Sequence, residues 1–240
     1  MKAIWFKSPF WYDFGMTLIH GSNYRKRFHK VAKIIGENKK ILDLGAGPCT
    51  LYFSLHKSNG YEGWDLNEDF VKANNKRGIR TRLKNCLDYN DYPDVDVIVL
   101  TDVLHHIAPH QSECLKHSLK HAKDKVIVLE PFEDKDKGHG IYWWLRQIRK
   151  KTGLEKLLGE YDGINEPEAI EIMPKGRLIQ FFKDHGDCQL FSLGREMFAV
   201  YERKDKNNNK KVHQRPNKSI KSNHQIKKSN LSKSAGTTSQ

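Results

Sequence analysis

The chain has 240 residues and a formal net charge of +13. This length is typical of one domain with appendages and is enough to bury a sizeable core. The four cysteines form no C-x-x-C pair, which argues against a disulfide framework. No apolar run has the length of a signal-peptide core or a membrane span, so we expect a cytoplasmic protein without a transmembrane segment.

The excess positive charge lies near the C-terminus. Residues 203–240 hold eleven Lys and Arg against one acid, or +10, which leaves +3 for the rest of the chain. Large apolar residues are almost absent from this segment, and we predict that it is a basic disordered tail. It can bind RNA, DNA or an anionic surface, or simply aid solubility, and composition does not choose among these.

Residues 1–38 are predicted to form an N-terminal helical cap. An aromatic-rich segment is followed by apolar residues that recur every three or four positions between Tyr24 and Ile35. This spacing is typical of an amphipathic helix. We therefore expect the segment to pack beside a sheet.

The most informative stretch is residues 40–55, KILDLGAGPCTLYFSL. A short apolar run, a glycine turn from Gly45 to Pro48 and a new apolar segment predict a strand, a tight turn and a helix over residues 51–56. The two glycines can take positive φ and come close to a ligand, and the helix N-terminus would offer unpaired N–H groups. Thr50 stands at the third glycine position of the dinucleotide fingerprint, so that fingerprint is incomplete.

Two acidic residues flank this turn in the predicted sheet. Asp43 precedes the first glycine by two residues, where a carboxylate would repel a pyrophosphate but suit an ammonium group. Asp65 ends a predicted strand over residues 61–66, near the spacing at which an acid accepts ribose hydroxyls. The alternative for Asp65 is a solvated acid at a strand end.

Further strands and helices follow at regular intervals. Asn67 is expected to cap a helix, and a third strand is expected to end near residues 83–87. Buried strands are predicted at residues 94–100 and 126–131. A helix over residues 175–186 precedes two strands, 189–193 and 196–201, joined as a tight hairpin.

The pattern Asp43-x-Gly45-x-Gly47, with Asp65 after the next strand, resembles motif I of the class I S-adenosylmethionine-dependent methyltransferases. The resemblance covers about residues 12–130. It implies an α/β, Rossmann-like, doubly wound and mostly parallel seven-stranded sheet with a C-terminal antiparallel hairpin. It places a methyltransferase domain at residues 39–202, with an insertion at about 132–186, and implies S-adenosyl-L-methionine as the cofactor.

The resemblance also implies the cofactor site. The family usually places an acid where Cys86 stands, so Asp88 or backbone groups would contact the adenine amine instead. In the family the N-terminal segment often folds over the cofactor, which makes Tyr12 and Arg25 candidates to touch it. The predicted cofactor-binding residues are Asp43, Gly45, Ala46, Gly47, Asp65, Leu66, Cys86, Leu87 and Thr101.

Two histidines follow the strand at residues 94–100. The family brings the methyl group to its acceptor near this loop, where His105 or His106 could act as a general base. Alternatively, one packs under the cofactor and the other faces solvent. A zinc site with His110 and Cys114 would need one helical face, which Pro109 interrupts, so no metal is predicted.

The sequence lacks the motifs of two classes of methyltransferase, and this limits the possible methyl acceptors. Residues 101–104 lack the D/N/S-P-P-aromatic motif for planar amino groups, and the only Pro-Cys pair lies in the glycine turn. We therefore expect transfer to an oxygen or nitrogen of a small molecule or lipid-like acceptor, in a pocket shaped by the insertion. Within it, the aromatic and basic residues 141–151 predict a lid, a packed helix or a membrane contact.

Three alternatives remain open at the level of sequence. They are an RNA methyltransferase that captures nucleic acid with its basic tail, a non-catalytic S-adenosylmethionine-binding scaffold, and a NAD-dependent oxidoreductase. The sequence alone does not give the acceptor or the oligomeric state.

Overall fold

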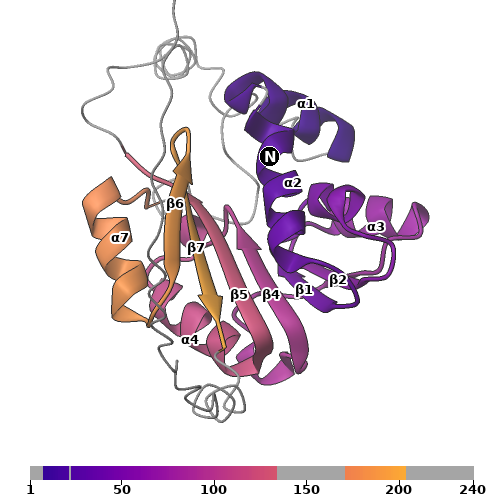
Figure 1. The fold of residues 1–240 in the computed structure, drawn as a ribbon. Coiled ribbons are helices and arrows are strands. Elements are labelled where there is room, and N and C mark those ends of the chain that lie inside the picture. The colour runs from indigo at the N-terminus through magenta and orange to yellow at the C-terminus, as the bar shows by residue number, and fades with distance from the viewer. Residues whose placement is uncertain (1–7, 22, 134–170, 204–240) are drawn as a thin grey trace, which may run out of the picture. The chain divides into compact units, whose positions relative to one another are not determined.

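The computed structural model describes residues 8–21, 23–133 and 171–203 (Figure 1). The chain divides into two units, Met1–Arg203 and Lys204–Gln240, and every described element belongs to the first. The predicted stretch 141–151, most of the predicted insertion and nearly all of the predicted tail lie outside the described residues. The predicted domain boundaries therefore stay predictions.

Seven strands form one sheet in the order β3-β2-β1-β4-β5-β7-β6. The first five of these strands pair in parallel, and β7 runs antiparallel to both β5 and β6. This confirms the predicted fold class, including the closing hairpin. The strands are β1 (Lys40–Leu44), β2 (Gly60–Asp65), β3 (Thr81–Leu83), β4 (Val95–Thr101), β5 (Ala122–Pro131), β6 (Gln189–Leu193) and β7 (Glu196–Glu202).

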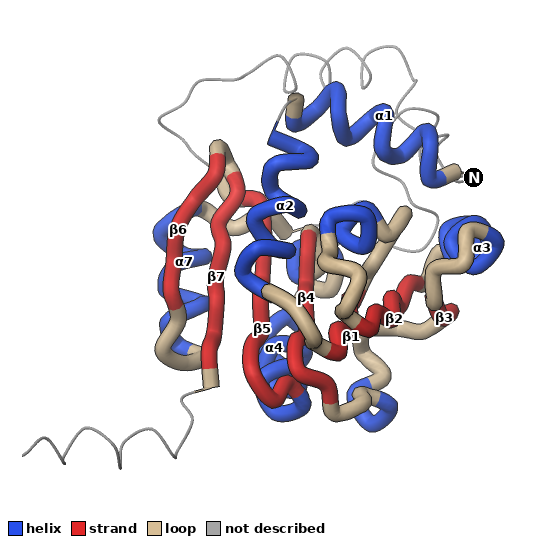
Figure 2. Tube along the Cα trace, turned by 45° about the vertical axis from the view of Figure 1, so that its right-hand side comes forward, coloured by secondary structure: helices blue, strands red, loops and turns tan. Residues whose placement is uncertain are grey.

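The helices pack on both faces of this sheet (Figure 2). Alternate residues of β4 serve the two faces: Val97 and Val99 join the cluster under α2, and Ile98 and Leu100 join the cluster under α4 and α7. The α-helices are α1 (Pro9–His20), α2 (Asn23–Ile35), α3 (Glu68–Lys76), α4 (Gln111–His121) and α7 (Lys175–Asp184). The 3₁₀ helices are η2 (Thr50–Ser54), η3 (Tyr89–Asp91) and η4 (Leu104–His106).

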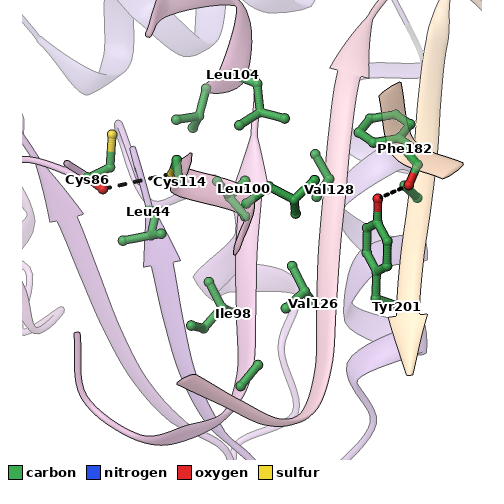
Figure 3. Packing of buried hydrophobic residues seen from close by; sticks show 14 of the residues in the cluster. Leu44, Cys86, Ile98, Leu100, Leu104, Cys114, Val126, Val128, Phe182 and Tyr201 are labelled. Atoms are coloured by element: carbon green, nitrogen blue, oxygen red, sulfur yellow. Dashed lines mark hydrogen bonds between the residues drawn. The ribbon is translucent and has the colours of Figure 1, made fainter. Parts of the chain in front are cut away.

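The apolar core on the α4 and α7 side fills the middle of the sheet. Figure 3 shows branched side chains of neighbouring strands, among them Leu100 and Val128, meeting in one layer. At the hairpin end of this layer the hydroxyl of Tyr201 donates to the carbonyl oxygen of Phe182 at 2.8 Å. The core thus extends from the parallel strands to β7 without a break.

One local prediction needs correction. The helix expected over residues 51–56 is a five-residue 3₁₀ helix, because Cys49 adopts the left-handed conformation (φ 59°) directly before it. A helix this short has only a small dipole, so it contributes less to ligand binding at the glycine turn than the predicted helix would. The third strand ends at Leu83, within the predicted region of residues 83–87.

The predicted cap of α3 is confirmed, whereas helix α1 was not predicted as a separate element. Asn67 accepts a hydrogen bond from the backbone N–H of Asp69, as the expected cap of α3. Helix α1 is a separate element, capped by Ser8 and begun by Pro9, that the aromatic segment did not reveal as a helix. Within the described part of the chain, no helix combines the length and apolarity that a membrane span requires.

Candidate functional site

A cleft lies at the carboxyl ends of β1 and β4, where the strand order reverses direction along the chain. In open α/β sheets this is where ligands bind. The space in the cleft, counted together with its opening to solvent, is about 330 Å³. Its lining comes from α1, α2, the glycine turn and the loop after β4: Tyr12, Tyr24, Arg27, Phe28, Asp43, Gly45, Ala46, Gly47, Pro48, Thr50, Thr101 and Asp102.

The glycine turn needs its glycines for two different reasons. Gly45 has a φ of +66°, and a Cβ there would lie 2.6 Å from a methyl carbon of Val103. Gly47 has a φ of +53°, but a Cβ there would meet nothing within 4 Å. Gly45 therefore permits close packing against the loop after β4, whereas Gly47 supplies only the backbone conformation.

Both polar groups of Gly47 are held by side chains from the neighbouring strand and helix. Its N–H donates to Asp65 Oδ2 at 2.7 Å, and its carbonyl oxygen accepts from Asn74 Nδ2 at 2.9 Å. The other oxygen of Asp65 accepts from the N–H of Asn67 at 2.7 Å. Asp65 therefore shapes the turn as well as bordering it, while the buried Asn74 had no signal in the sequence.

Asp43 is a buried carboxyl group at the end of β1, 3% exposed. The hydroxyl of Tyr61 donates to its Oδ2 at 2.7 Å. Burial raises the pKa of Asp43 from 3.8 to about 7, the hydrogen bond from Tyr61 opposes this rise, and the nearby charge of Asp65 adds to it. The group is therefore poised to ionise when a cation is placed beside it.

Arg27 is a buried cation on α2, 1% exposed, that sequence reasoning did not assign. It donates to Asp102 Oδ2 and Glu196 Oε1, each at 2.7 Å. Burial disfavours its charge, but the two carboxylates outweigh this and raise the pKa of Arg27. Arg25, the arginine named from the sequence, is exposed. The sequence did indicate that Arg27 is unusual, because this charged residue interrupts the apolar stripe from Tyr24 to Ile35.

Helix α1 is attached to the edge of the cleft by one carboxylate. Asp13 Oδ1 accepts from the hydroxyls of Tyr24 at 2.6 Å and Thr50 at 2.9 Å. This contact places Tyr12 in the cleft lining, with its ring 5.4 Å from that of Phe70. Burial raises the pKa of the Tyr12 phenol, so it stays protonated at neutral pH.

The loop after β4 carries the two predicted histidines. Asp102 takes a left-handed φ of +56°, and His105 and His106 follow in η4 with their ring centroids 4.1 Å apart. His105 Nδ1 lies 2.7 Å from Oε2 of Glu130, the buried acid at the end of β5. No group of three potential metal ligands occurs among the described residues.

The fold has counterparts among known proteins. An 83-residue region is 34% identical to trans-aconitate 2-methyltransferase of Mycolicibacterium gilvum, and it covers 33% of this chain and 32% of that protein. Among solved structures, magnesium protoporphyrin IX methyltransferase from Synechocystis PCC 6803 with bound SAH superposes with a TM-score of 0.53 at 13% identity, covering 75% of this chain and 84% of that chain. The chain has the class I methyltransferase fold.

A second solved methyltransferase agrees on the fold. An O-methyltransferase family protein from Burkholderia thailandensis gives a TM-score of 0.51 at 18% identity, covering 78% of this chain and 62% of that chain. No protein-family model matches the sequence. The chain spans about a third of the length of the curated relative that it matches. The resemblance predicted from the glycine turn and its acids is confirmed.

The methyltransferase fold brings most, but not all, of the predicted cofactor residues to the cleft. Asp65 borders the cleft through its bond to Gly47, and Leu66, 40% exposed, follows it. The side chain of Cys86 is buried in the core on the α4 side, with Leu87 packed against that core (Figure 3). Those in the lining are Asp43, Gly45, Ala46, Gly47 and Thr101.

Two side chains of the core hold the backbone carbonyl of Cys86. Cys114 Sγ donates to the carbonyl oxygen of Cys86 at 3.9 Å, and the hydroxyl of Tyr92 donates to the same oxygen. By contrast, the hydroxyl of Thr101 is buried beside the cleft with no hydrogen-bond partner among the described residues. Contacts of Cys86, Leu87 and Thr101 to a cofactor stay predictions.

Proposed function

We propose that this protein transfers a methyl group from S-adenosyl-L-methionine to an oxygen or nitrogen of a small-molecule or lipid-like acceptor. The fold and the region shared with a curated methyltransferase support the reaction class. An O-methyltransferase family protein and a porphyrin methyltransferase among the structures of the same fold fit a small-molecule acceptor.

The observation that carries the proposal is the charge of the cleft. Asp43 and Asp102 line it and Asp65 borders it, whereas Arg27 is the one lysine or arginine among the described lining residues. Arg27 is already paired with two carboxylates, Asp102 and Glu196. A site with this excess of carboxylates favours a cationic ligand and disfavours a pyrophosphate.

S-adenosyl-L-methionine fits these residues. When bound, it supplies an electrophilic methyl group on a positively charged sulfur, and its amino group is a second cation. Asp43, with a pKa near 7, would become fully ionised beside such a ligand. Gly45 is exposed at the same edge, and the hydroxyl of Thr101 is a buried group that can bond a polar ligand atom.

Titration calorimetry with S-adenosyl-L-methionine, SAH and NAD tests the binding part. We expect the first two to bind in preference to NAD. We expect Asp43→Asn to weaken binding of S-adenosyl-L-methionine at least about 30-fold, equivalent to about 2 kcal/mol, because it removes a buried charge partner. Glu113→Gln removes one exposed charge from the first turn of α4 and serves as the matched control. Preferential binding of NAD would refute the proposal.

The acceptor class is tested by transferring labelled methyl from S-adenosyl-L-methionine into a cell extract. The extract is then separated into lipid, nucleic acid, protein and small-molecule fractions. We expect label in the small-molecule or lipid fraction. Label confined to nucleic acid would instead support the RNA alternative.

A further inference from the structure

Helix α1 exposes three large aromatic side chains that lie next to one another. Phe10 is 69% exposed, Trp11 is 43% exposed and Phe14 is 47% exposed. The ring centroids of Phe10 and Trp11 are 5.4 Å apart and those of Trp11 and Phe14 are 6.1 Å apart, edge to face in both cases. Single exposed apolar residues are common on proteins, but a contiguous group of them marks an interaction site. We call these three residues the aromatic face.

The other side of the same helix belongs to the cleft. Tyr12 is in the cleft lining, and its ring contacts that of Phe70. Side chains two positions apart in an α-helix project from nearly opposite sides, so Phe10 and Phe14 point away from the side on which Tyr12 lies. A partner bound to the aromatic face would therefore be separated from the cleft by one helix.

Helix α2 adds positive charge beside α1. It begins three positions after the last residue of α1, and Figure 2 shows it leading from one end of α1 toward the sheet. Its thirteen residues include no aspartate or glutamate. The exposed basic side chains of α2 are Arg25, Lys26, His29, Lys30 and Lys33. Arg25 and Lys26 lie in the first turn, so they are the closest of these in the chain to α1.

We propose that the aromatic face, together with Arg25 and Lys26, binds the surface of an anionic lipid bilayer. Aromatic rings on one side of a helix bury in the boundary between headgroups and acyl chains, and lysine and arginine attract anionic headgroups. Single-stranded nucleic acid fits less well, because it needs cations along the rings that stack on its bases. The twelve residues of α1 include no lysine or arginine.

This surface gives the acceptor a source. Binding to a bilayer does not depend on methyl transfer, but its use does, and this part rests on the proposed function. A lipid-like acceptor in the bilayer would have only α1 between it and the cleft that Tyr12 lines.

Sedimentation of the full chain with lipid vesicles tests the proposal. The vesicles contain phosphatidylcholine alone, or equal parts of phosphatidylcholine and phosphatidylglycerol. Phe10→Ser, Trp11→Ser and Phe14→Ser are made singly and together, and Arg25→Gln is combined with Lys26→Gln. Leu83→Ser, at a 54% exposed apolar residue of the edge strand β3, is the matched control for a single change. Residues 204–240 are present in every variant, so differences between variants do not arise from that basic segment.

We expect the wild-type protein to prefer the anionic vesicles. The triple aromatic change should weaken binding to them at least about 30-fold, because it removes most of the apolar area available for insertion. The double charge change should weaken the same binding about tenfold and leave binding to phosphatidylcholine alone unchanged. Leu83→Ser should have no effect. Phosphatidylcholine brominated on its acyl chains should quench part of the tryptophan fluorescence, and Trp11→Phe should remove that part.

Vesicle binding that is unaffected by the triple aromatic change would overturn the inference. The same result combined with lost binding to single-stranded RNA, or with lost self-association, would assign the aromatic face to RNA or to a second copy instead. All these variants should keep their affinity for SAH within about threefold, because none of the changed side chains lines the cleft. Failure of the wild-type protein to bind SAH would overturn the proposed function and leave the vesicle result standing.

Discussion

Strand β4 is apolar through its middle and is followed by polar residues at its carboxyl end. In the middle, Val97 to Leu100 have no exposed surface and pack in the two apolar clusters of the core. At the carboxyl end, the buried groups include Asp43, Arg27 and Glu130. Apolar burial stabilises the fold, whereas buried charges are costly unless they are paired. Burial of the apolar middle of the sheet therefore offsets the free-energy cost of the buried charges at the cleft.

The largest effect is expected from breaking the pairing of Arg27. Arg27→Leu leaves Asp102 and Glu196 buried without their shared cation and should lower the free energy of unfolding by about 3 to 5 kcal/mol. Urea unfolding measures this loss. Arg25→Leu, an exposed change on the same helix, should cost within about 0.5 kcal/mol. A loss below about 1 kcal/mol for Arg27→Leu would show that the network does not stabilise the fold.

Asp43→Asn should change stability in the opposite direction and raise the free energy of unfolding. The pKa of this carboxyl is about 7 in the folded protein against an ordinary value of 3.8, so the folded state holds its proton more tightly than the unfolded state. The contribution of Asp43 to stability therefore falls as pH rises from about 4 to about 7, by about 4 kcal/mol in all.

The measurement is urea unfolding of wild type and Asp43→Asn across this pH window. Asparagine can still accept from Tyr61, so the variant should gain stability over wild type as pH rises and then stay level above about pH 7. Parallel pH profiles for the two proteins would contradict the assignment. The same substitution weakens cofactor binding in our proposal, so function and stability oppose each other at this residue.

A smaller effect is expected at the two glycines of the turn. Gly45→Ala should cost about 1 to 3 kcal/mol, because it adds a Cβ 2.6 Å from a Val103 methyl in addition to the strained φ. Gly47→Ala is the matched control with the strained φ alone and should cost about 1 kcal/mol. Adding Val103→Ala should recover part of the loss at Gly45 but none at Gly47. Equal losses at both glycines would show that the contact is unimportant.

The smallest effect is expected from removing the basic segment. Every described site residue belongs to the unit Met1–Arg203, so a chain ending at Arg203 should keep its unfolding free energy within about 0.5 kcal/mol and its affinity for SAH. The deletion removes ten Lys and Arg. We expect neither protein to methylate bulk RNA. Methyl transfer to RNA that disappears on truncation would favour the RNA alternative instead.

The sequence was most informative where a local pattern has a local cause. The glycine turn, the Asn67 cap and the hairpin at Gly194 depend on neighbouring residues, and the predicted elements occur there. The left-handed Cys49, which shortens the next helix to a 3₁₀ turn, gave no such signal because only glycine commonly marks that conformation.

Contacts between distant segments were the part that sequence reasoning missed. Arg27 bonds to Glu196, 169 residues away, and Glu130 bonds to His105, 25 residues away. Only the fold brings these partners together. Cys86, which was predicted to contact the cofactor, is buried in the core, where Cys114 of α4 bonds to its carbonyl oxygen, and its contact to a cofactor stays a prediction. A charged residue inside an apolar helical stripe, as at Arg27, is the signal that was available.

The hydrogen bonds of Asp65 and Asn74 to Gly47 affect the rate at which a ligand associates with the glycine turn. Asp65 accepts from its N–H and Asn74 donates to its carbonyl oxygen, so contacts within the chain fix the backbone at the centre of the turn. A ligand that binds there does not have to order this segment first, because the loss of its conformational entropy occurs during folding. Association with the turn should therefore be a single step, limited by encounter rather than by rearrangement of the loop.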